Sequence, residues 1–157
     1  MMGLLWPEPG PGSISNYDKG KVNVRTQPCN AQVSQGRLRK AQSFMDAANF
    51  IHEFANQDEE VDDAYVTLCV HAGIAASDVI CCINLGEHAK GESHSDAVDL
   101  LKRVDQEAAK QLSALLNLKT KSGYSHTPVT AAEFKRAGRA ATALVEKARR
   151  VHASARG

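Results

Sequence analysis

A cation-rich junction holds the residue types that could carry out chemistry on a phosphate. Lys119, Lys121 and His126 lie close together, and Gly123 and Pro128 interrupt the helical pattern around them. A histidine can move a proton at neutral pH, and an ammonium group stabilises the negative charge that develops on phosphate. We therefore predict that His126, Lys121 and Lys119 are candidate catalytic residues for metal-independent cleavage of a phosphodiester.

Aromatic and arginine side chains beside this junction are candidates for binding RNA or a nucleotide. Tyr124 could stack on an unpaired base. Arg136 and Arg139 are three residues apart, so they share a helix face and could contact phosphates. A lone tyrosine at a helix end more often packs its ring, and a charge run is commonly a solvated face. Both interpretations stay open.

The remaining histidines and serines indicate neither a metal site nor a serine nucleophile. His88 and His94 lie six residues apart, which fits no standard helix-borne metal pair, so we expect no metal, and we expect His94 to fasten its loop. His71 lies in an apolar helical segment and is expected to be a core or interface histidine. Ser122 and Ser125 belong to no nucleophile elbow, and neither a P-loop nor a dinucleotide fingerprint occurs. We expect no cofactor.

Charge is distributed unevenly along the chain. Residues 117–157 carry nine basic and two acidic side chains, so the net charge of +1 divides into +7 there and −6 over residues 1–116. This asymmetry suits an anionic partner or self-association through opposite patches. A solvated helix face is the alternative.

Cysteine use and hydropathy indicate a compartment. The four cysteines form no C-x-x-C pair and three lie in an apolar segment, so we expect buried free thiols in a reducing cytoplasm. We find no segment approaching the ~18 apolar residues of a membrane span and no secretory leader. We therefore expect a cytoplasmic protein with no membrane contact.

Apolar periodicity predicts an all-α bundle of four to five helices with an irregular N-terminal arm. Residues 1–36 form this Pro- and Gly-rich arm, with a short edge strand over residues 21–25, and residues 37–157 form the bundle. The helices are expected at about residues 36–56, 61–85, 93–101, 105–123 and 130–151.

Local signals place the helix ends. Gly86 is a plausible stop for the second helix. Ser93 with Asp96, and Thr130 with Glu133, have the spacing of capping boxes, and Asp105 could cap the fourth helix. Small residues in the second helix permit close helix approach, which is consistent with a dimer interface.

Two segments together resemble a HEPN domain. One is the long apolar helix that ends at Gly86, followed by Glu87-His88-Ala89-Lys90-Gly91-Glu92-Ser93-His94 and the short helix after it; the other is the junction from Lys119 to His126 with the capped last helix. The resemblance covers roughly residues 38–152 and is closest to an actinobacterial-type branch. It implies a helical bundle that pairs as a homodimer.

The resemblance also implies a choice of functions. Many HEPN domains are metal-independent RNA endonucleases of toxin–antitoxin and phage-defence systems, whose motif is an arginine and a histidine with four to six residues between them. Here Lys121 or Lys119 stands at that spacing from His126, and lysine lacks the planar fork of arginine. Gly123 and Tyr124 resemble the non-cleaving branch that accompanies nucleotidyltransferases.

These observations predict a module that binds RNA or a nucleotide and keeps a degenerate nuclease motif. The implied partners are a second copy of the chain and a nucleotidyltransferase or an antitoxin. An active RNA endonuclease and a purely structural subunit are the alternatives.

Overall fold

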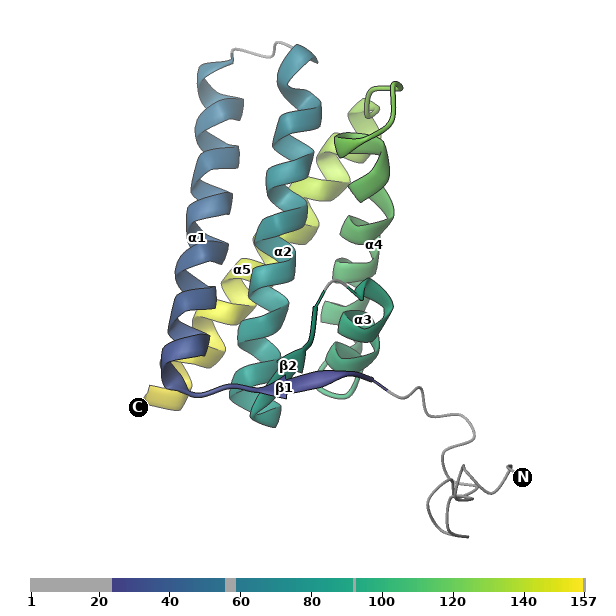
Figure 1. Cartoon of the computed structure of the whole chain (residues 1–157). Coiled ribbons are helices and arrows are strands. Elements are labelled where there is room, and N and C mark those ends of the chain that lie inside the picture. The colour runs from purple at the N-terminus through teal and green to yellow at the C-terminus, as the bar shows by residue number, and fades with distance from the viewer. Residues whose placement is uncertain (1–23, 56–58, 92, 157) are drawn as a thin grey trace, which may run out of the picture.

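The computed structural model describes residues 24–55, 59–91 and 93–156. These residues form five α-helices and one two-stranded sheet (Figure 1). The elements are β1 (Thr26–Pro28), α1 (Ala31–Phe54), the 3-10 turn η3 (Glu59–Val61), α2 (Asp62–Leu85), β2 (Glu87–Ala89), α3 (His94–Lys102), α4 (Gln106–Gly123) and α5 (Ala131–Arg156). The predicted all-α bundle is confirmed.

Helix α2 is the centre of the bundle and packs against α1, α4 and α5 (Figure 1). Most of its alanines and all of its valines are buried, among them Ala72, Ala76 and Val79. A side chain at Gly73 would collide with Leu115 of α4, so this glycine permits close approach of the two helices. The small residues of α2 are therefore used inside one chain and do not form an exposed surface for a dimer.

The apolar character of α2 corrects one expectation from the sequence. By length and composition this helix could cross a membrane, with a mean hydropathy of 1.9 over its most apolar window. Within the bundle, 67% of that window is buried. The surrounding helices thus supply the apolar contacts that a bilayer would otherwise provide, as they do around the core helix of a globular protein.

The first helix begins earlier than its apolar pattern predicted. Asn30 caps it, with its side-chain oxygen accepting a hydrogen bond from the Val33 N–H at 2.9 Å. The edge strand is Thr26–Pro28 rather than 21–25, and it pairs antiparallel with β2. Residues 1–23 of the predicted arm lie outside the described residues.

Most predicted helix ends are confirmed. Gly86 ends α2 with a positive φ of 74°, a conformation that costs glycine little. Asp105 accepts a hydrogen bond from the Ala108 N–H at 3.0 Å. The capping box before α3 is wrong: Ser93 makes no side-chain capping bond, and Asp96 instead pairs with Arg25 at 3.5 Å.

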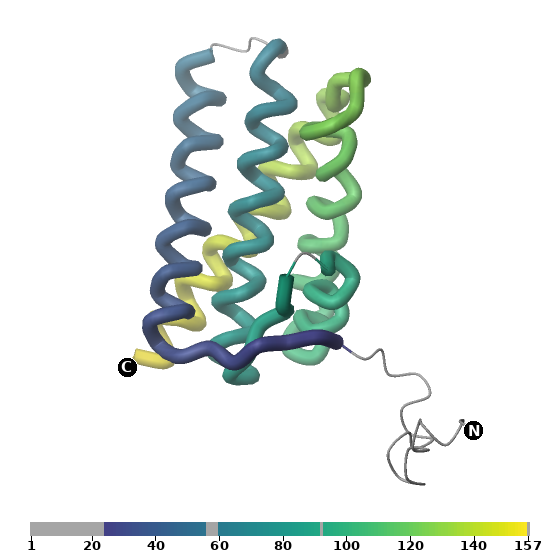
Figure 2. Tube along the Cα trace, in the orientation of Figure 1, coloured from purple at the N-terminus to yellow at the C-terminus, as the bar shows by residue number. Residues whose placement is uncertain are grey.

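The cysteine prediction is half wrong. Cys69 and Cys81 are free and buried, as expected, but Cys29 and Cys82 form a disulfide. The segment that contains β1 crosses the end of α2 (Figure 2). There the Cys29 N–H donates to the Gly86 oxygen at 3.0 Å, which holds Cys29 next to the last turn of that helix. Because disulfides persist mainly in oxidising environments, this bond does not favour the reducing compartment that the sequence suggested.

Candidate functional site

The junction before α5 gives Lys121 a structural partner. A capping box starts α5: the Thr130 N–H donates to Glu133 Oε1 at 2.8 Å, and the Glu133 N–H donates to Thr130 Oγ1 at 3.1 Å. Lys121 Nζ lies 2.8 Å from the same Glu133 oxygen. The Lys121 ammonium, helped by the Thr130 N–H, lowers the pKa of Glu133 to about 2. Lys121 therefore joins the end of α4 to the start of α5.

Lys119 contacts a different element from the one to which Lys121 binds. Its ammonium group lies 2.7 Å from Nε2 of His94, the first residue of α3. Because an ammonium group can only donate, this Nε2 accepts the hydrogen bond. The expectation that His94 fastens the region around its loop agrees with this contact. The two lysines of the predicted motif thus hold different parts of the fold.

His126 and Tyr124 lie in the connection between α4 and α5, and both are exposed. Tyr124 is 79% exposed, which leaves its ring accessible for stacking. The contacts of Lys119 and Lys121 described above go to His94 and Glu133. The hypothesis of one catalytic pocket that contains His126 and both lysines therefore stays a prediction.

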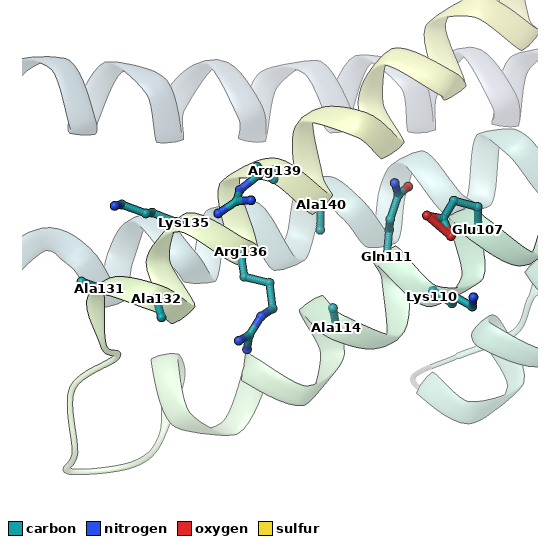
Figure 3. Close-up of a pocket in the computed structure, with 10 residues that line it drawn as sticks. All are labelled: Glu107, Lys110, Gln111, Ala114, Ala131, Ala132, Lys135, Arg136, Arg139 and Ala140. Atoms are coloured by element: carbon teal, nitrogen blue, oxygen red, sulfur yellow. The ribbon is translucent and has the colours of Figure 1, made fainter.

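An open groove between α4 and α5 brings the basic side chains together (Figure 3). Its volume is about 610 Å³. The lining side chains are mostly basic or small: Lys110, Lys135, Arg136, Arg139, Gln111, Glu107 and four alanines. This α4–α5 groove thus holds four cations and one carboxylate, a net positive charge that favours an anionic ligand.

Helical spacing explains how α5 supplies its side of the groove. Ala132, Lys135, Arg136, Arg139 and Ala140 follow the three- and four-residue steps of one helix face. The short side chains of the alanines leave space between the longer basic side chains. In Figure 3 Arg136 extends from α5 toward α4. Helix α5 begins at Ala131, so the loop with Tyr124 and His126 directly precedes this basic face.

Sequence reasoning found Arg136 and Arg139 but missed Lys110, Gln111 and Lys135 as members of the same groove. Lys135 is adjacent to Arg136 and could have been included from helical spacing. Lys110 and Gln111 belong to α4, and only the packing of α4 against α5 brings them alongside. The apolar stripe of α4 predicted that packing without specifying which polar residues border it.

A second cavity of about 630 Å³ lies between the sheet, α1, α2, α3 and Lys119 of α4. We call it the sheet cavity; its polar lining includes Arg37, His71, Asp78, His88, His94 and Lys119. His71 is not in the core, because the residue is largely exposed, although its ring is partly shielded and lies 5.4 Å from that of Phe44. The core interpretation is therefore wrong, and the interface interpretation stays a prediction. Sequence reasoning missed this cavity because its walls come from six separate elements.

Contacts inside the sheet cavity pair several of its charged groups. Arg37 Nε donates to Asp78 Oδ2 at 2.9 Å, and His88 Nδ1 lies 3.8 Å from the other Asp78 oxygen. Burial raises the pKa of the Asp78 carboxyl, although Arg37 and His88 oppose this effect. Burial, together with Lys119 and Arg37, lowers the pKa of His71.

No family model matches the sequence, and no curated protein matches it. The resemblance to HEPN domains therefore stays a prediction from the residues.

Proposed function

We propose that this protein is an RNA-binding module of HEPN type that holds the phosphates of a single-stranded RNA in the α4–α5 groove. The observation that carries the proposal is the lining of this groove, where four basic side chains face a single carboxylate. Neutralisation of phosphates by lysine and arginine releases counterions and drives binding without sequence specificity.

The neighbouring loop supports a single-stranded ligand. The ring of Tyr124 is exposed in the connection that leads into α5, the helix with the basic face. Unpaired bases stack on aromatic rings, whereas the bases of a duplex are already stacked on each other. A basic groove for the backbone beside an exposed ring for a base is the combination that single-strand binders use.

Binding without cleavage fits the contacts of the motif lysines better than catalysis does. Lys121 contacts Glu133 and Lys119 contacts His94 of α3, so neither of these contacts joins a motif lysine to His126. Cleavage would require one of the lysines to reach the phosphate next to His126. The active endonuclease is therefore the alternative, and the same experiment tests it.

The experiment measures fluorescence anisotropy of a labelled single-stranded RNA against salt concentration, in EDTA. The double variant Arg136→Gln/Arg139→Gln should weaken binding about tenfold or more and reduce the salt slope by about 1.4, since each phosphate contact on a single strand contributes about 0.7. Arg149→Gln/Arg150→Gln is the matched control, because these exposed arginines lie on α5 but do not line the groove. Equal loss in both double variants would contradict the proposal.

Cleavage is followed on a gel with the same RNA and with His126→Ala as the control. Cleavage by the parent protein that disappears in this variant would establish the endonuclease. The proposed HEPN character also includes a homodimer, which light scattering after gel filtration measures directly. Association with a nucleotidyltransferase or an antitoxin remains part of the same proposal.

A further inference from the structure

The sheet cavity gathers two cations and three imidazole rings that are not part of the proposed RNA groove. Arg37 comes from α1, His71 and Asp78 from α2, His88 from β2, His94 from α3 and Lys119 from α4. Arg37 and Lys119 therefore supply two cations against the one carboxylate of Asp78. We propose that the sheet cavity is a second, separate anion site that binds the phosphoryl group of a small phosphomonoester.

Both cations keep hydrogen-bond donors for a ligand. Lys119 has three N–H groups, of which one is directed to His94. Arg37 has five, of which its Nε–H is directed to Asp78. Arginine and lysine are the residues that most often bind phosphoryl oxygens in proteins. The existing contacts position these two groups without using up their capacity to donate.

The N-terminal end of α3 lies at the same wall. Ser93, His94 and Ala97 line the cavity. The N-terminus of a helix carries a partial positive charge, which favours an anion. This helix end supports the proposal only together with Arg37 and Lys119, whose side chains supply the charge.

A small phosphomonoester fits this cavity better than a metal ion or an RNA strand. The volume of about 630 Å³ lies within the range of small-molecule sites. Among residues 24–55, 59–91 and 93–156, no group of three or more histidine, cysteine or acidic side chains is arranged to hold a metal. His88 is already engaged, because Nδ1 lies 3.0 Å from the Ala89 oxygen and Nε2 lies 3.3 Å from the Gln27 amide nitrogen.

Proton uptake should accompany binding. The groups around His71 are Arg37 and Phe44 of α1, Asp78 of α2, His88 of β2, His94 of α3 and Lys119 of α4. With its pKa lowered, His71 is neutral in the free protein near pH 7. An anion in the cavity stabilises the protonated ring, so affinity should rise as the pH falls from about 7.5 to about 5.5.

The experiment measures amide and histidine ring NMR signals of the whole protein during titration with inorganic phosphate, ribose 5-phosphate and AMP. All three should shift the signals of Ser93, His94 and Ala97. Tighter binding of the two esters than of phosphate would identify an organic phosphate as the ligand, and equal affinity would identify free phosphate. Saturable shifts confined to the α4–α5 groove, or none at millimolar concentration, would overturn the proposal.

Two variants separate charge from folding. Lys119→Gln should weaken binding roughly tenfold or more, since hydrogen bonds to charged groups are the stronger class. Lys110→Gln, on the same helix but lining the other groove, should leave it unchanged. Equal affinity of Lys119→Gln and the parent would overturn the proposal. If Lys119→Gln fails to fold, the NMR shifts of the wild-type protein alone test whether the ligand binds in the sheet cavity.

The dependence on pH is measured with sulfate, whose charge does not change in this range. Affinity for sulfate should rise on acidification, and His71→Gln should flatten this rise. If both proteins respond equally to pH, His71 is not the group that takes up the proton, and that part of the proposal falls.

Discussion

The α4–α5 groove and the sheet cavity both gather cations, but they are built in opposite ways. The groove takes its basic residues from two neighbouring helices, and its longest run lies on one face of α5. The cavity takes one to three residues from each of six elements. Across it Arg37 pairs with Asp78, and Lys119 pairs with His94. Basic residues at helical spacing are enough to form a charged surface on one helix. A cavity lined by six elements forms only when all of those elements have packed together.

Residues of the cavity should contribute more to the stability of the fold than residues of the groove. Exposed groove residues can be changed at little cost, because water replaces their contacts. Residues of the cavity also support the fold, because removing one partner leaves another charged or polar group without compensation. The cavity and the groove should therefore respond differently to mutation, to reduction and to acid.

Reduction of the disulfide should have the largest effect. Cys29 and Cys82 enclose a separation of 53 residues, for which the loss of chain entropy on closure predicts about 3–4 kcal/mol of stabilisation. Urea unfolding with and without dithiothreitol measures this difference. Because Cys29 directly follows β1, reduction should also weaken binding in the sheet cavity, to which Gln27 and Pro28 contribute, and leave RNA binding unchanged.

Thiol counting checks the same bond independently. Burial raises the pKa values of Cys69 and Cys81 to about 12, so both thiols should react slowly in the native protein. An alkylating reagent should modify two cysteines after unfolding without reductant and four after unfolding with it. Four reactive thiols without reductant would show that the disulfide does not form.

Loss of Arg37 should have the next largest effect. Arg37→Met leaves the carboxylate of Asp78 largely buried and without its closest cation, which should lower the free energy of unfolding by about 2–3 kcal/mol. Arg136→Met in the groove should change it by less than about 0.5 kcal/mol. Urea denaturation of the two variants compares the sites directly. Equal effects would remove the distinction between a supporting cavity and a free groove.

The cap of α5 should show a smaller and pH-dependent effect. Thr130→Ala should cost about 1 kcal/mol, as for other N-cap threonines. The folded pKa of Glu133 is about 2, below its ordinary value of 4.5. Its contribution is therefore complete above pH 4.5 and is lost as the pH falls toward 2. Glu133→Gln should flatten the stability profile in that window, and an unchanged profile would contradict the role of the Lys121 contact.

Signals that act over a few residues were readable from the sequence. The capping box of Thr130 and Glu133, the cap at Asp105 and the stop at Gly86 all depend on neighbouring backbone groups, and each is confirmed. The pairing of Arg136 with Arg139 on one helix face is likewise a local property. The all-α architecture follows from the same short-range periodicity.

Features that depend on distant contacts were not readable in this way. The bond between Cys29 and Cys82 requires β1 to lie against β2, and three residues of strand give almost no sequence signal. The exposure of His71 depends on which side of α2 the other helices cover. Ser93 and Asp96 had the spacing of a capping box, but the contact of Asp96 with Arg25 competes with it.

The most direct test of two separate anion sites is one NMR experiment on the isotope-labelled protein, titrated with a short single-stranded RNA and then, in a second sample, with sulfate. We predict that RNA shifts the amide signals of residues 107–114 and 131–140, whereas sulfate shifts the amide signals of Ser93, His94 and Ala97. A response of both sets to either ligand, or of the sheet cavity to RNA alone, would contradict it.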